Sequence, residues 1–135
     1  QSYQDSKGRE LTMRTYPAGD QHFVRVYDKA KTPNLPDGTK YGDAGKANLR
    51  MERDIQGNVR AHLQDIETMP GYQEAGTGSV MLKECESIAK TNHAQEIYGL
   101  APDDEKTRQW YAKRGYEFRK ANGGGTDVYK KLPSS

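Results

Sequence analysis

The sequence has a single cysteine and no long run of apolar residues. Of its 135 residues only Cys85 carries a thiol, so no disulfide can form within the chain. Such cysteine usage is typical of a reducing compartment, and we expect a cytoplasmic protein. No stretch of about 18 apolar residues is present, which argues against a membrane-spanning helix, and no signal peptide is evident. The chain begins at Gln1, so we expect a processed product or part of a longer protein.

The chain has few apolar residues and a low net charge. The apolar fraction is 33% and the formal net charge is +2. A low net charge argues against disorder, and nine tyrosines can fill a core while their hydroxyls stay in contact with water. Lysine and arginine are mixed with aspartate and glutamate throughout, so neither a nucleic-acid partner nor a membrane partner is expected. We expect a small core with polar ends.

Potential metal ligands are few and scattered. His22, His62 and His93 do not combine with Cys85 into any metal-ligand spacing, so no metal site is predicted. Cys85 falls on the apolar face of a predicted helix. A buried, inert thiol is therefore favoured over a nucleophile.

Hydrophobic periodicity predicts an α+β fold with a mixed sheet. Residues 1–10 are polar and without period, so we expect a flexible end or linker, followed by a single domain over 11–135. Helical spacing predicts helices over 79–91 and from Asp103 or Asp104 to about Arg114. A proline- and glycine-rich loop is expected over 31–45. Strands are predicted over 11–16, 23–28, 47–53, 59–69, 94–101, 116–119 and 126–132, the first two as a hairpin.

The fourth predicted strand changes phase part-way along its length. Apolar residues share one parity from Val59 to Leu63, and Ile66 then falls on the other. A β-bulge near Gln64 and Asp65 would produce this shift, and so would an isoleucine that simply faces a second layer.

A glycine-rich turn joins this strand to the first helix. It reads PGYQEAGTGSVML over 70–82 and contains Gln73, Gly76 and Gly78 in the pattern Q-x-x-G-x-G. A glycine-rich turn that opens a helix exposes backbone N–H groups at the positive end of the helix dipole, and these attract a phosphate. The turn therefore predicts a phosphate-bearing ligand, and the alternative is a plain strand-to-helix connection.

The residues after the turn exclude two common nucleotide motifs. Gly78 is followed by Ser79 and Val80, where a nucleotide P-loop has lysine and then serine or threonine. Met81 stands where a dinucleotide fingerprint has its third glycine. The phosphate must therefore belong to another class of ligand.

Three pieces occur in order between Leu63 and Phe118: QDIETMPGYQEAGTGSVMLKECESIAK, QEIYGLAP and DEKTRQWYAKRGYEF. Together they resemble the GNAT family of N-acetyltransferases. In that family the glycine turn cradles the pyrophosphate of acetyl-coenzyme A, and a later helix ends in an aromatic-Tyr-x-x-x-Gly-aromatic signature, here Trp110 to Tyr116. The resemblance implies a GNAT-like splayed mixed β-sheet flanked by helices. The splay would lie between the strands over 59–69 and 94–101, with the pantetheine arm in the gap.

The resemblance also implies binding residues. Glu67, Thr68 and Met69 lie where the family's strand pairs with the pantetheine amides, and Asp104 stands where the family commonly has an asparagine. The residues implied for the turn itself are Gln73, Glu74, Ala75, Gly76, Thr77, Gly78 and Ser79. Glu74 is acidic where the family commonly has a basic residue, and a carboxylate near a pyrophosphate weakens binding.

Tyr111 stands where the family often places a tyrosine that protonates the departing thiolate. The chemistry needs such a donor, since attack of an amine on a thioester produces an oxyanion and then a thiolate. The alternative is a packed aromatic ring with its hydroxyl bonded elsewhere. An acceptor amine is protonated at neutral pH, so a base is also needed. Glu67 is the first candidate, Asp65 the second and His62 the third, and a water relay could replace all three.

The resemblance implies an enzyme that moves an acetyl group from acetyl-CoA to a primary amine of a small molecule or peptide by direct attack. The family's first strand is usually followed by one or two helices that shape the acceptor site. Residues 11–45 offer no amphipathic helix, so reduced N-terminal helices are expected. Two alternatives follow: a weak or inactive acyl-CoA-binding or interaction domain, and a domain appended to a larger protein or assembly. A longer chain or a dimer partner would then complete the acceptor side.

Overall fold

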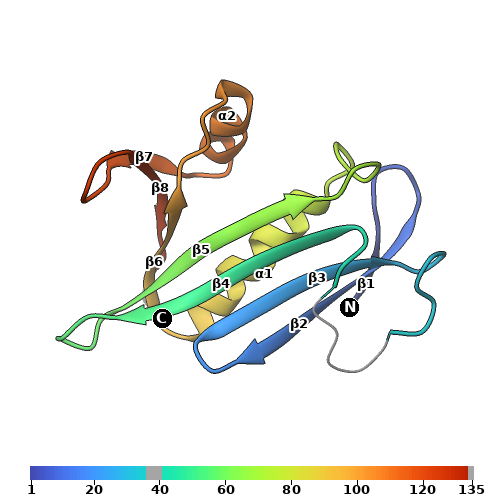
Figure 1. Cartoon of the computed structure of the whole chain (residues 1–135), viewed down its shortest axis with the longest axis horizontal. Helices are drawn as coiled ribbons and strands as arrows, with labels where there is room; N and C mark the ends of the chain where they lie inside the picture. The colour runs from blue at the N-terminus through green and yellow to red at the C-terminus, as the bar shows by residue number, and fades with distance from the viewer. Residues whose placement is uncertain (36–40, 134–135) are drawn as a thin grey trace.

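Strands from both halves of the chain join into one sheet (Figure 1). The computed structural model describes residues 1–35 and 41–133. Across the sheet the strand order is β1-β2-β3-β4-β5-β6-β8-β7. In chain order the elements are β1 (Ser2–Gln4), β2 (Glu10–Ala18), β3 (Gln21–Asp28), β4 (Gly45–Arg53), β5 (Val59–Thr68), α1 (Thr77–Thr91), β6 (Ala94–Leu100), α2 (Glu105–Lys113), β7 (Glu117–Lys120) and β8 (Thr126–Lys131).

The predicted hairpin near the start of the chain is confirmed. Strands β2 and β3 pair antiparallel in register from Leu11 opposite Asp28 to Ala18 opposite Gln21. Strand β4 follows β3 with no helix between them in residues 29–35 and 41–44. The loop predicted over 31–45 falls partly outside the described residues. The expected reduction of the N-terminal helices therefore holds for the described part of this segment.

Residues 1–10 carry a strand that their sequence does not signal. Ser2 to Gln4 form β1, which pairs antiparallel with the start of β2. A tight turn over residues 5–9 then leads into β2. A flexible end stays a prediction, but the backbone of this segment is paired with the rest of the sheet.

Helix α1 packs its apolar stripe on one face of the sheet and passes behind β4 and β5 in Figure 1. Met81, Leu82, Cys85 and Ala89 are buried at the three- and four-residue spacing that the sequence predicts. Burial raises the pKa of the Cys85 thiol to about 12, with smaller effects from the neighbouring glutamates. The prediction of a buried thiol is confirmed, and its proton is held too firmly for nucleophilic chemistry at neutral pH.

Of the two explanations for the change of phase in β5, the structure shows the β-bulge. Asn48 of β4 lies opposite Asp65, whereas the next residue lies opposite Leu63, so Gln64 is the extra residue. The bulge returns Ile66 to the face covered by α1 and turns Asp65 and Glu67 to the opposite face. Without it, both carboxylates would share the buried face of Leu63.

The splay expected between β5 and β6 is present. These two strands pair in parallel only from Val59 to His62, which lies opposite Tyr98. A Cβ at Gly99 would stand 2.6 Å from the carbonyl oxygen of Leu63, so only glycine permits this close approach. Beyond it the strands diverge, β6 pairs with β8, and α2 stands beside the open part of β5 (Figure 1).

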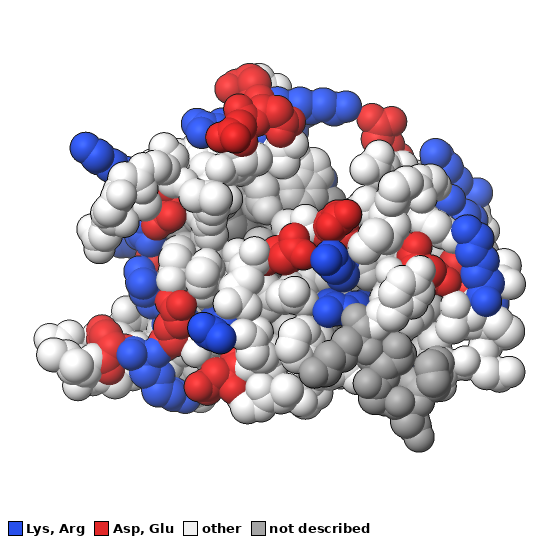
Figure 2. Space-filling view, in the orientation of Figure 1, with Lys and Arg blue, Asp and Glu red and all other residues white. Residues whose placement is uncertain are grey.

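The sheet face turned away from α1 is polar. Lysine, arginine, aspartate and glutamate are interspersed on it (Figure 2). Lys46, Asp65 and Glu67 belong to this face, next to the splay. Among the described residues no helix is long and apolar enough to cross a membrane.

Candidate functional site: a glycine turn beside the splayed strands

The glycine turn presents a row of free backbone donors. Glu74 and Gly76 adopt left-handed conformations, with φ of 60° and 94°. Left-handed residues between right-handed ones turn successive N–H groups toward one side, which makes a concave anion site. No N–H group from Gln73 to Ser79 donates to a described residue, and α1 begins with no side-chain cap. A phosphate would satisfy donors that otherwise depend on water.

Two buried side chains anchor the glycine turn to the sheet. The side chain of Tyr72 is buried, and its hydroxyl donates to the carboxylate of Asp28 at 2.7 Å. Thr77, the first residue of α1, is only 1% exposed, and its hydroxyl shares a hydrogen bond of 3.1 Å with that of Tyr3. These anchors fix the turn relative to β1 and β3.

Helix α2 holds the other side of the turn. A Cβ at Gly78 would lie 3.2 Å from the Trp110 ring, so glycine allows the helix start to meet this ring. The Arg114 guanidinium lies 4.1 Å from the centre of the same ring and donates to the Ser79 hydroxyl at 2.6 Å. The sequence signature that contains Trp110 therefore packs directly against the glycine turn.

The acidic residue of the turn is neutralised. Lys106, at the start of α2, lies 3.1 Å from the Glu74 carboxylate. Both side chains are largely exposed, at 85% and 78%, so the pair is weak and can exchange partners. The side-chain amide of Gln73 reaches back to the carbonyl oxygen of Thr68 at 3.5 Å.

Backbone hydrogen bonds narrow the residues available along β5. The N–H of Met69 donates to Ala44 and its carbonyl accepts from Tyr72, at 3.1 and 3.0 Å. Met69 therefore has no free donor for a pantetheine arm. Thr68 remains as a backbone candidate, because it lies opposite Gly45 at a position where its N–H and carbonyl face away from β4. Glu67 lies opposite Lys46 at a hydrogen-bonded position of the same strand pair, so its side chain is the part that is available.

Tyr111 occupies the interior beside the splay. Its ring packs edge-on against Trp110 and Tyr116, and the residue is only 6% exposed. Burial raises the pKa of Tyr111 to about 12, with smaller effects from Cys85 and Asp65. Its hydroxyl makes no hydrogen bond to any described residue, so the alternative of a hydroxyl bonded elsewhere gains no support. The phenol is protonated at neutral pH and its hydroxyl is unengaged, so it is available to donate a hydrogen bond or a proton, although the raised pKa makes it a weaker acid than a free tyrosine.

Each of the three candidate bases has a charged neighbour. Lys46 lies between two of them, with its Nζ 3.2 Å from Asp65 and 3.9 Å from Glu67. The third, His62, stands at the last paired position before the splay, and its Nδ1 lies 3.3 Å from Glu52. The structure thus brings Asp65 and Glu67 together on one cation and leaves His62 in a separate pair.

Asp104 is occupied as a helix cap. Its carboxylate accepts from the Thr107 N–H at 3.1 Å and from the Thr107 hydroxyl at 2.7 Å. These hydrogen bonds lower the pKa of Asp104. Of the two residues from which the second helix was predicted to start, Asp103 and Asp104, the second is therefore its N-cap.

Sequence reasoning missed the contacts made by the N-terminal turn. Ser6 N–H donates to the Ala75 carbonyl at 3.0 Å, and Arg9 donates to the Gly71 carbonyl at 2.7 Å. Backbone carbonyls accept these bonds, so no side-chain pattern announces them. No cluster of potential metal ligands is present in the described residues.

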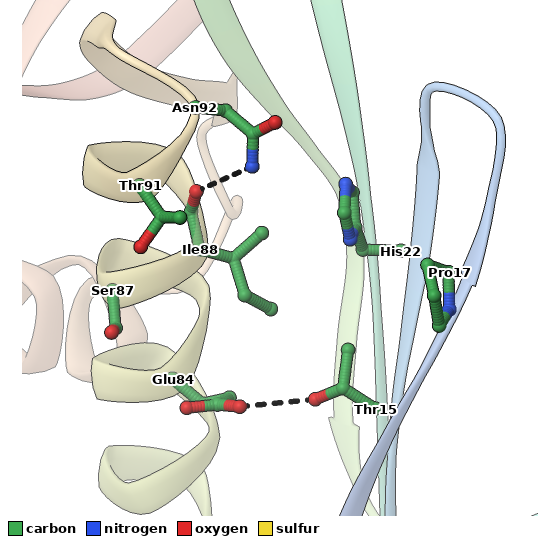
Figure 3. Close-up of a pocket in the computed structure, with 8 residues that line it drawn as sticks. All are labelled: Thr15, Pro17, His22, Glu84, Ser87, Ile88, Thr91 and Asn92. Carbon is green, nitrogen blue, oxygen red and sulfur yellow. Dashed lines mark hydrogen bonds between the residues drawn. The ribbon is translucent and has the colours of Figure 1, made fainter.

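A separate groove of about 420 Å³ lies between α1 and the β2–β3 hairpin (Figure 3). Thr15 donates across it to Glu84 at 3.0 Å, and burial lowers the pKa of His22 on its wall. The groove shares no residue with the glycine turn or the splay. It is lined by Thr15, Pro17, His22, Glu84, Ser87, Ile88, Thr91 and Asn92.

Several solved structures that share this fold are described as acetyltransferases. PaiA N-acetyltransferase from Thermoplasma acidophilum, in complex with coenzyme A, matches with a TM-score of 0.61 and 20% identity over 84% of this chain. The chain spans 62% of the length of that protein. A GNAT-family acetyltransferase from Staphylococcus aureus Mu50 gives a TM-score of 0.64 and 15% identity, covering 84% of this chain and 69% of that one.

Arabidopsis thaliana NAA60, in complex with a bisubstrate analogue, gives a TM-score of 0.62 and 13% identity, covering 87% of this chain and 79% of that one. Likenesses at these identities concern the fold alone. No curated protein sequence matches this chain. The sequence itself matches the family profile described as Acetyltransferase (GNAT) family over residues 9–116, which takes in the glycine turn, the splay and the Trp110–Tyr116 signature. The chain therefore belongs to the GNAT family of acetyltransferases.

Proposed function

We propose that this protein is an acetyl-CoA-dependent N-acetyltransferase that acts on a primary amine by direct attack. The observation that carries the proposal is the row of unpartnered N–H groups from Gln73 to Ser79, placed beside a splayed pair of strands. A diphosphate fits these donors because they converge at the positive end of α1.

Different residues of the site would bind the pyrophosphate and the pantetheine arm of acetyl-CoA. The backbone of the turn would hold the pyrophosphate, and Lys106 is free to exchange Glu74 for a phosphate. The open edge of β5 at Thr68 would pair with the amides of the pantetheine arm, with the Glu67 side chain next to it. The chemistry that acetyl-CoA supplies is an acetyl group on a thiolate leaving group.

The reaction needs one proton acceptor and one proton donor. Glu67 takes a proton from the ammonium form of the acceptor, and the free amine attacks the thioester carbonyl carbon. The C–N bond forms and the C–S bond breaks. The thiolate takes the Tyr111 hydroxyl proton, and the second proton lost by the nitrogen restores the phenol. Glu67 then returns its proton to water, so one acetyl amide, one thiol and one proton result.

Asp65 is the second candidate for the base. The bulge places it on the same face as Glu67, and Lys46 contacts both carboxylates. Glu67 comes first because it lies nearer the open end of β5, opposite Lys46, whereas Asp65 lies at the bulge. His62 is third, since it lies before the splay and pairs with Glu52.

A catalytically weak or inactive acyl-CoA-binding domain is the second candidate function. The observation that favours it is the uncovered sheet face: in the described residues no helix lies between β2 and β4 to shape an acceptor site. In an active enzyme the acceptor, a small-molecule or peptide amine, would have to bind on this face. A longer chain or a dimer partner would then supply the missing wall.

Calorimetry and a thiol-release assay test the proposal. Acetyl-CoA and free CoA are titrated into the protein, and turnover is followed with a panel of primary amines. We expect binding of both ligands, with turnover lost in Tyr111→Phe and in Glu67→Gln and retained in Glu117→Gln, a remote glutamate on β7. No binding heat at millimolar ligand would overturn the proposal. Binding without turnover of any amine would favour the inactive domain.

A further inference from the structure

The tight turn over residues 5–9 lies against the glycine turn from the side opposite α2. Two hydrogen bonds join the two segments: Ser6 N–H to the Ala75 carbonyl at 3.0 Å, and Arg9 Nη1 to the Gly71 carbonyl at 2.7 Å. Tyr3 of β1, just before the tight turn, adds a hydrogen bond to Thr77 at 3.1 Å. They reach the glycine turn at its start, in its middle and at the first residue of α1. The N-terminal segment therefore contacts the turn along most of its length.

The hydrogen bond from Ser6 sets the direction of one donor in the turn. A trans peptide is planar, so its carbonyl and the following N–H point in opposite directions. Because the Ala75 carbonyl points at Ser6, the Gly76 N–H points away from the N-terminal turn. This N–H is one of those that donate to no described residue, and its orientation is what an anion on the open side requires.

Arg9 is held in place on several sides. Its Nε donates to Asp5 at 2.7 Å, and its guanidinium lies 4.4 Å from the centre of the Tyr72 ring. The Asp5 side chain is fully buried and also accepts from the N–H groups of Lys7 and Arg9. Burial alone would raise the pKa of Asp5, but these hydrogen bonds outweigh burial and lower it. Arg9 therefore meets the Gly71 carbonyl as part of a fixed, charged cluster.

We infer that the turn over residues 5–9 positions the phosphate-binding turn, and that Arg9 is a positioning residue for cofactor affinity. The inference rests on the proposed function for its ligand. The only hydrogen bond from Arg9 to the glycine turn goes to the Gly71 carbonyl, and not to any of the N–H groups that would face a phosphate. Its effect on a phosphate passes through the backbone of Gly71 to Gly76 and not through its own charge.

Two acetyl donors of different length can show whether Arg9 positions the phosphate-binding turn or only stabilises the fold. Acetyl-CoA reaches the glycine turn, whereas acetyl-pantetheine ends before the pyrophosphate. For Arg9→Gln we expect the Kd of CoA to rise about tenfold, the loss typical of one charge-assisted hydrogen bond, with the KM of acetyl-pantetheine unchanged. Lys7→Gln, an exposed position in the same turn, should change neither quantity.

Arg9→Lys separates geometry from charge. Lysine keeps the charge but cannot bridge Asp5 and Gly71 with a planar fork, so we expect Arg9→Lys to bind CoA nearly as weakly as Arg9→Gln. Wild-type affinity in Arg9→Lys would overturn the positioning role in favour of long-range attraction. An equal loss for CoA and acetyl-pantetheine would also overturn it. If Arg9→Gln does not fold, Arg9→Lys alone decides between these outcomes.

A measurement without ligand keeps the inference distinct from the proposed function. The heteronuclear ¹⁵N NOE of the Gly76 amide reports motion of the turn in the free protein. We expect it to fall in Arg9→Gln and to stay at the wild-type value in Lys7→Gln. Failure of the wild type to bind CoA would overturn the proposed function, whereas an unchanged NOE in Arg9→Gln would overturn the positioning role.

Discussion

Replacement of Gly76 by alanine tests whether the left-handed turn is built for its ligand. Gly76 has a φ of 94°, and a Cβ added there meets no atom within 4 Å. No clash therefore contributes, and the cost is the backbone strain of an L-residue in the left-handed region, about 1–2 kcal/mol. This strain must appear either in the stability of the free protein or in the affinity for the ligand.

Two limiting outcomes bracket the result. If the introduced alanine keeps the left-handed conformation, the protein unfolds roughly 3–8 °C lower and the Kd of CoA is unchanged. If the turn relaxes, stability is kept, the peptide at this position rotates, and CoA binds roughly 5- to 30-fold more weakly because binding must restore the strained form. Intermediate behaviour divides the same free energy between the two measurements.

Gly57→Ala is the matched control. Gly57 lies in the β4–β5 hairpin with a φ of 86°, and its added Cβ also meets nothing within 4 Å. Alanine restricts the unfolded chain equally in both variants, so this effect cancels when the two variants are compared with each other. Thermal unfolding and calorimetry with CoA are measured on both. The reasoning is refuted if Gly76→Ala matches the wild type in both unfolding temperature and Kd, or if Gly57→Ala weakens CoA binding as much as Gly76→Ala does.

Three further predictions concern single side chains. Tyr111→Phe should lower kcat about 100-fold or more with little change in the KM of acetyl-CoA, and an unchanged kcat would exclude the proton-donor role. Because burial raises the pKa of Tyr111 to about 12, the folded protein holds a proton that the unfolded chain releases near pH 10. The free energy of unfolding of the wild type, measured in urea, should therefore fall between pH 10 and 12, and it should fall less in Tyr111→Phe. Glu74→Gln should change the free energy of unfolding by less than about 0.5 kcal/mol, since the ion pair of Glu74 with Lys106 is exposed. Calorimetry should show CoA binding a few-fold more tightly to this variant, because a negative charge near the pyrophosphate is removed, and weaker binding would contradict this. Glu96→Gln should cost about 2 kcal/mol in urea unfolding, because the nearly buried Glu96 accepts two hydrogen bonds from Arg119, at 3.0 and 2.5 Å, and a loss below about 0.5 kcal/mol would contradict it.

Periodicity predicted the strands and helices because one face of each is buried. The parity change at Ile66 was consistent with a bulge, since a single inserted residue reverses every later side chain of a strand, but it fitted equally an isoleucine that faces a second layer. The splay followed only from the family resemblance. Nothing in the local pattern reports that β5 and β6 stop pairing at His62, because the pairing joins residues that are far apart in the sequence.

The site was harder to predict wherever the backbone supplies the contacts. The bonds from Ser6 and Arg9 to carbonyls of the glycine turn could not be inferred from side-chain types. Met69 was a reasonable candidate for pairing with the pantetheine arm until its N–H and carbonyl proved to be used within the chain. The carboxylates near the splay were found from the sequence, but their shared partner Lys46 comes from the neighbouring strand, and its register with β5 depends on the bulge.

The glycine turn has a consequence for the kinetics of the proposed enzyme. Its N–H groups would bind phosphates, which acetyl-CoA and the released CoA have in common, and the turn lies away from the acetyl group. Interactions made equally with substrate and product cannot favour one over the other. Released CoA would therefore compete for the free enzyme with an inhibition constant close to the Kd of the donor. The rate would follow the ratio of acetyl-CoA to CoA, so the enzyme would respond to the acetylation state of the coenzyme pool and not only to its size.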